Sequence, residues 1–145
     1  MTNGLRLMSA VVVAMALVGS DAWAKTQPKA AEQVYDCRMT TGSSNLIPPR
    51  ILIIRNLATN EIKVLDGLIY TIQKDPMPAK VKVDSASRLE LGWTIRKLPL
   101  TGGDGDGTGI FALTFIKGDL SVHESIVLAG FDNAENRSGT CALVK

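Results

Sequence analysis

Hydrophobic and polar residues alternate in short runs along most of this 145-residue chain. The clearest run extends from Arg88 to Arg96, where Leu89, Leu91, Trp93 and Ile95 share one face. Because successive side chains of a strand point to opposite faces, this pattern predicts a β-strand with one buried side and one solvent-facing side. Similar alternation, or a short β-branched run, predicts further strands at residues 33–40, 50–56, 61–65, 68–72, 80–84, 110–116, 119–128 and 139–144.

Short turn sequences separate these runs. Asp66-Gly67 is a dipeptide typical of hairpin turns, and Lys117-Gly118 predicts another tight turn. Residues 101–109 and 130–136 are predicted to be loops. After the first 24 residues, no stretch of ten or more residues has the apolar spacing of a long amphipathic helix. Short turns join antiparallel neighbours, so we expect an all-β, antiparallel fold.

The first 24 residues have the pattern of a secretory signal peptide. Arg6 precedes an apolar run from Leu7 to Val18, and small residues follow as far as Ala24. This run is shorter than the roughly 20 residues that a membrane-spanning helix needs. We therefore expect a signal peptide over 1–24, a flexible leader over 25–32 and a single β domain over 33–145. The mature protein would be periplasmic or secreted and have no membrane span.

Export determines how the two cysteines are interpreted. In an oxidising compartment, Cys37 and Cys141 are expected to form a disulfide. Bridged cysteines hold their Cα atoms within about 4.4–6.8 Å, so the first and last strands must be neighbours. We therefore predict a small antiparallel up-and-down β-barrel of about eight strands, closed by one disulfide. A β-sandwich with the bridge across its sheets is the alternative.

The charge distribution gives no indication of a polyanionic partner. Without its first 24 residues, the chain has 15 Lys and Arg against 13 Asp and Glu, interspersed along the sequence. Proteins that bind nucleic acids usually have a clustered stripe of basic residues along the path of the phosphate backbone. The sequence shows no such cluster, so nucleic-acid binding is not expected.

Catalytic chemistry has few candidate groups in this sequence. His123 is the only histidine, and no G-x-S-x-G motif marks a serine nucleophile. A closed zinc site needs about four ligands, so we expect no metal and no cofactor. The aspartates that a two-carboxylate mechanism could use mostly fall at predicted turns, where this residue is common: Asp66, Asp75, Asp84, Asp104, Asp106 and Asp132. We predict that the protein is not an enzyme. A hydrolase using His123 or two of these aspartates is the alternative.

The segment 102–109 alternates glycine with polar residues. Its Asp104 and Asp106 resemble part of a calcium loop, but the full EF-hand spacing is absent. A flexible connection that forms a lid over one barrel end is the favoured interpretation, with a weak calcium loop as the alternative.

Three features resemble the small periplasmic C-type lysozyme inhibitors: Tyr35-Asp36-Cys37, a cysteine near the end of the chain, and Ser85-Ala86-Ser87 after a strand. This resemblance implies an eight-stranded barrel with a disulfide between terminal strands and a serine-bearing loop that enters the lysozyme cleft. The chain departs from the family at Arg88-Leu89, where the family has a glycine followed by small and aromatic residues, and in its longer tail.

These observations predict an exported, non-enzymatic binding protein. The barrel would hold a small apolar ligand in its interior or a protein partner at one rim. A protein inhibitor that uses the turn Ser85-Ala86-Ser87 is the nearest variant, and a purely structural envelope protein is a further alternative. Trp93, Phe111 and Phe115 are expected to lie in the core or to line a barrel cavity.

Overall fold

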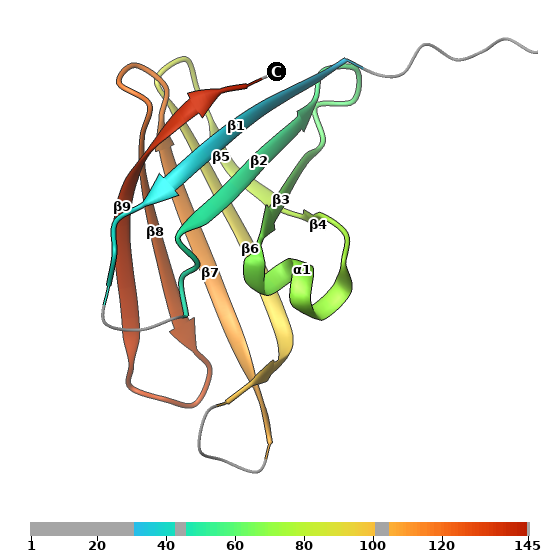
Figure 1. Cartoon of the computed structure of the whole chain (residues 1–145). Coiled ribbons are helices and arrows are strands. Elements are labelled where there is room, and N and C mark those ends of the chain that lie inside the picture. Colours follow the sequence, from blue (N-terminus) through green and yellow to red (C-terminus); the bar gives the residue numbers. More distant parts are fainter. Residues whose placement is uncertain (1–30, 43–45, 101–104, 145) are drawn as a thin grey trace, which may run out of the picture.

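The chain forms an all-β, nearly closed up-and-down barrel of nine antiparallel strands (Figure 1). The computed structural model describes residues 31–42, 46–100 and 105–144. The elements of this part of the chain are β1 (Glu32–Met39), β2 (Arg50–Asn56), β3 (Ile62–Asp66), α1 (Gly67–Gln73), β4 (Met77–Pro78), β5 (Lys80–Asp84), β6 (Arg88–Pro99), β7 (Asp106–Ile116), β8 (Ser121–Leu128) and β9 (Ala134–Leu143).

The strands form a single sheet in the order β4-β3-β2-β1-β9-β8-β7-β6-β5. Pairing of β1 with β9 joins the first and last strands, and the sheet ends at β4 and β5. β4 and β5 do not pair with each other, but only Ala79 separates them in the chain, and its N–H donates to the Ile62 carbonyl of β3 at 2.9 Å. The seam of the barrel lies where the chain passes from β4 into β5. The predicted barrel is confirmed, with a two-residue strand, β4, that the sequence analysis did not anticipate.

The disulfide is present, and it lies within the β1–β9 pair. Cys37 and Cys141 are directly opposite each other in the register of the two strands, and both are buried. The predicted signal peptide, and all of the predicted leader except Ala31 and Glu32, lie outside the described residues. Among the described residues, no helix has the length and apolar character needed to cross a bilayer.

The strand predicted at Leu68 to Ile72 is wrong, because these residues belong to the short helix α1. The preceding Asp66 is the N-cap, and its Oδ1 accepts a hydrogen bond of 2.7 Å from the backbone N–H of Ile69. An Asp-Gly dipeptide suits a hairpin turn, but an aspartate also suits a helix N-cap. Here the helix buries Ile69 completely against the barrel, a tertiary contact that the local sequence does not reveal.

Two predicted loops are shorter than expected, because strands extend into them. β9 begins at Ala134 and β7 at Asp106. Gly107 and Gly109 face the barrel interior, where an added Cβ would lie 2.9 Å from Leu100 Cδ2 and from Phe111 Cε2 respectively. Glycine at these strand positions therefore leaves room for neighbouring core side chains.

Alternation along the strands builds the core as predicted. The face of β6 that carries Leu89, Leu91, Trp93 and Ile95 is buried, and the Trp93 and Phe111 rings stack with centroids 5.3 Å apart. Other buried hydrophobic side chains of the described residues come from β1, β2, β3, α1, β7, β8 and β9, and Ile47 is contributed by the connection between β1 and β2. Side chains from around the barrel thus pack together in its interior.

Candidate functional site

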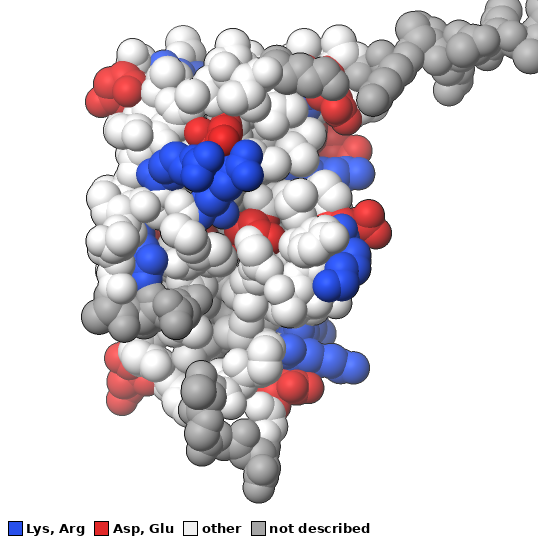
Figure 2. Space-filling model, viewed as in Figure 1, with Lys and Arg blue, Asp and Glu red and all other residues white. Residues whose placement is uncertain are grey.

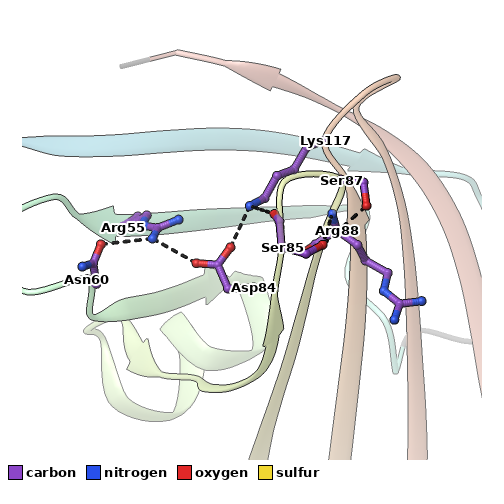
Figure 3. Close-up of polar contacts among 7 residues, drawn as sticks. All are labelled: Arg55, Asn60, Asp84, Ser85, Ser87, Arg88 and Lys117. Carbon is purple, nitrogen blue, oxygen red and sulfur yellow. Dashed lines mark hydrogen bonds and ion pairs between the residues drawn. The ribbon is translucent and has the colours of Figure 1, made fainter.

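The predicted partner-binding turn projects from one end of the barrel. Ser85, Ala86 and Ser87 connect β5 to β6 and are all exposed (Figure 3). The β2–β3 and β7–β8 turns lie at the same end (Figure 1). We call this end the serine rim and define it by residues 57–61, 85–87 and 117–120.

Hydrogen bonds fix the conformation of the turn. The Ser85 N–H donates to the Arg88 carbonyl at 2.8 Å, and the Arg88 N–H donates to Ser85 Oγ at 3.0 Å. From the neighbouring β7–β8 turn, the Lys117 N–H donates to the Ser87 carbonyl at 2.9 Å, and the Lys117 ammonium donates to the Ser85 carbonyl. The turn is therefore held both locally and by an adjacent element.

A chain of ion pairs extends from the turn across the barrel seam (Figure 3). Asp84 binds Lys117 Nζ through Oδ1 at 2.6 Å and Arg55 Nη2 through Oδ2 at 2.9 Å. The hydrogen bond from Lys117, with Arg55 nearby, holds the pKa of Asp84 below its ordinary value. These contacts connect β5 with the end of β2, two strands that do not pair with each other in the sheet.

The Arg55 guanidinium also donates a hydrogen bond to a second residue, and one of its nitrogens has no partner among the described residues. Its Nη2 donates to Asn60 Oδ1 at 3.0 Å in the β2–β3 turn. Its Nε is buried and has no hydrogen-bond partner among the described residues.

A pocket of about 240 Å³ lies beside these cations. Its apolar wall consists of Ile53, Leu89 and Phe115, which are buried, and of Tyr35, whose ring centroid is 4.8 Å from that of Phe115. The polar part of its lining is formed by Gln33, Arg55 and Lys117. We call this cavity the rim pocket. It combines an apolar wall with two cationic side chains.

The remaining candidates from the sequence do not come together in one site. Asp106 is exposed at the start of β7, opposite Pro99, and Asp104 lies outside the described residues. His123 is exposed on β8, and its Nδ1 lies 3.1 Å from Ser138 Oγ on β9. Among the described residues, no group of three or more His, Cys, Asp or Glu side chains is arranged to hold a metal ion.

A polar cluster inside the barrel consists of the buried Asp66, Glu124 and Arg137 and the partly buried Glu135. Sequence analysis considered Asp66 alone among these residues. Arg137 Nη2 pairs with Glu135 Oε1 at 2.8 Å, whereas neither carboxylate oxygen of Glu124 has a hydrogen-bond partner among the described residues. Burial, together with the nearby negative charges of Asp66 and Glu135, raises the pKa of Glu124 to about 8, although Arg137 acts in the opposite direction. Alternation could have located Glu124, because Val122 and Ile126 on the same face are buried.

Two further pockets flank Pro48 and Pro49 near α1. One, of about 330 Å³, is lined by these prolines and by residues that include Leu52, Leu65 and Tyr70. The other, of about 440 Å³, reaches from the same prolines to the buried Arg137. Neither is lined by a residue that the sequence analysis selected as a binding residue.

Charged side chains of both signs are interspersed on the face seen in Figure 2. Where β1 and β2 pair, Arg50 donates two hydrogen bonds to the Asp36 carboxylate, at 2.8 and 3.0 Å, and Arg38 lies 3.6 Å away. The hydrogen bonds from Arg50 hold the pKa of Asp36 below its ordinary value.

Comparison of the chain with protein-family models, with curated proteins and with solved structures gives no match.

Proposed function

We propose that this protein is an exported, non-enzymatic binding protein that engages a protein partner through the turn Ser85-Ala86-Ser87. One observation carries the proposal: the turn is exposed and yet fixed by hydrogen bonds from Arg88 and Lys117. A loop that is ordered before binding loses little conformational entropy when it binds, so more of its contact energy contributes to affinity.

The resemblance to C-type lysozyme inhibitors suggests the partner class. The side chains at the tip of the turn are small, which suits insertion into an enzyme cleft. Lys117 places positive charge beside the turn, whereas the Arg88 guanidinium pairs with Glu90. Glycosidase clefts contain a pair of carboxyl groups, so the charges of the turn and of such a cleft are complementary. We therefore propose a C-type lysozyme as the partner.

A lysis assay on bacterial cell walls tests this function. The oxidised protein is expected to inhibit a C-type lysozyme and to bind it in a direct affinity measurement. Ala86→Lys adds a long, charged side chain at the exposed tip, so it should weaken inhibition by at least about tenfold. Asn133→Lys adds the same side chain to the exposed β8–β9 loop and should inhibit like the unaltered protein.

Two results would contradict the proposal. Absence of both binding and inhibition by the folded, oxidised protein would exclude a C-type lysozyme as the partner. Equal inhibition by the Ala86→Lys and Asn133→Lys variants would show that the turn is not the contact surface.

A further inference from the structure

We propose that the rim pocket binds a small amphipathic anion, a carboxylate attached to one aromatic ring or to a short hydrocarbon chain. This site is separate from the proposed contact at the turn, although Lys117 both lines the pocket and donates a hydrogen bond to the Ser85 carbonyl of the turn.

Charge complementarity identifies the polar end of the ligand. Arg55 and Lys117 both line the pocket, and Asp84, which pairs with both, supplies only one negative charge against two positive ones. The two Arg55 contacts described above both use Nη2, so Nε is a buried donor without a partner among the described residues. A buried donor without an acceptor is costly, and a ligand carboxylate would remove that cost with a charge-assisted hydrogen bond.

Binding need not disrupt the serine rim. Lys117 Nζ donates to Asp84 Oδ1 and to the Ser85 carbonyl, and an ammonium group can donate in more than two directions. A ligand carboxylate can therefore approach Arg55 and Lys117 while the ion pairs with Asp84 remain in place.

The wall of the pocket identifies the other end of the ligand. Ile53, Leu89 and Phe115 are at most 4% exposed, so they form a fixed apolar surface. Tyr35 packs against Phe115 and adds an aromatic edge. The volume of about 240 Å³ lies just below the range of about 300–1,000 Å³ that is usual for ligand pockets, so the ligand should be small.

An NMR titration with three matched probes tests the site. Phenylacetate has the ring and the carboxylate, 2-phenylethylamine has the ring with a positive charge, and acetate has the carboxylate alone. Phenylacetate, added up to about 10 mM, is expected to shift the resonances of Tyr35, Leu89 and Phe115 and of their neighbours. The other two probes should cause much smaller shifts at the same concentration.

Variants then locate the carboxylate. Arg55→Gln should weaken phenylacetate binding about tenfold, because it removes a charge-assisted hydrogen bond. Arg96→Gln removes the same charge from an exposed position on β6 and should leave the affinity unchanged. Gln33→Trp adds volume within the pocket without removing a core side chain, so it should abolish binding in a folded protein.

Three results would overturn the inference: no shifts with phenylacetate, equal shifts with phenylacetate and 2-phenylethylamine, or equal affinities of the Arg55→Gln and Arg96→Gln variants. The lysozyme assay uses no small ligand, so its outcome and the outcome of this titration can be separated.

Discussion

Glu124 shows how a single buried residue can set the pH dependence of the whole protein. Its side chain is fully buried, and its Cα is opposite that of Arg137 in the β8–β9 register, yet Arg137 binds Glu135. Asp66 from β3 adds a nearby negative charge. With a pKa of about 8, Glu124 is mainly protonated at neutral pH in the folded protein.

The stability of the protein should therefore fall as pH rises from about 4.5 to about 8 through the contribution of Glu124. In this interval the unfolded chain releases the proton, whereas the folded protein keeps it, so deprotonation favours unfolding. The slope for one such group is about 1.4 kcal/mol per pH unit at most. Asp66, whose pKa burial also raises, acts in the same direction.

Glu124→Gln keeps the shape of the side chain and cannot ionise. We expect this variant to lose much less unfolding free energy than the unaltered protein between about pH 6 and pH 8.5, as measured by urea denaturation. Glu61→Gln, at an exposed position before β3, is the matched control and should retain the original pH dependence. Identical pH profiles for the Glu124→Gln variant and the unaltered protein would show that Glu124 does not carry this effect.

At the scale of elements, the stability of the short helix α1 depends on its N-cap and on its packing. It has only seven residues, which is too short for a stable isolated helix, and it is held by the Asp66 cap and by the buried Ile69. At the other end, the backbone N–H of Lys74 donates to the Tyr70 carbonyl in a left-handed C-cap.

Replacement of Asp66 tests the cap. Asp66→Ala and Asp66→Asn both remove the carboxylate, but only asparagine keeps an oxygen that can accept the Ile69 N–H. We expect Asp66→Ala to be less stable than Asp66→Asn by about 1 kcal/mol in urea denaturation. Equal stability of the two variants would mean that the cap contributes nothing to the fold.

The strands were predictable wherever a local pattern determines them. The faces of β6 follow from alternation alone, and the Ser85–Ser87 turn follows from short polar residues between two alternating runs. The helix α1 was not predictable, because burial of Ile69 depends on the barrel against which it packs. The rim pocket was not predictable for the same reason, because the ion pair beside it joins Arg55 and Asp84, which are distant in sequence.

At the scale of the whole molecule, the barrel has two different closures. β1 and β9 are joined by backbone pairing and by the disulfide. Two further backbone hydrogen bonds extend this pairing, from the Thr40 N–H to the Ser138 carbonyl and from the Val144 N–H to the Val34 carbonyl. At the seam, β4 and β5 do not pair with each other, but the chain runs from one into the other through Ala79, whose N–H donates to the Ile62 carbonyl. Nearer the serine rim, the ion pair of Arg55 with Asp84 connects β2 with β5. The first closure thus depends on strand pairing and a disulfide, and the second on chain continuity, one backbone hydrogen bond and an ion pair.

The disulfide should stabilise the protein mainly by restricting the unfolded chain. It closes a loop of 104 residues, and the strands that carry it are already held together by the β1–β9 pairing in the folded state. The chain-entropy model gives about 4.7 kcal/mol for a loop near this length.

Replacement of both cysteines by alanine should consequently preserve the fold and lower the unfolding free energy by about 2–5 kcal/mol, as measured by urea denaturation at about 25 °C. A circular dichroism spectrum of the variant should still be that of the same barrel. The reduced form of the unaltered protein is the control, because it keeps both side chains but lacks the covalent link, and it should be about as unstable as the variant. If the oxidised protein, the reduced protein and the variant all unfolded at one urea concentration, the backbone pairing of β1 with β9 would account for this closure without the disulfide.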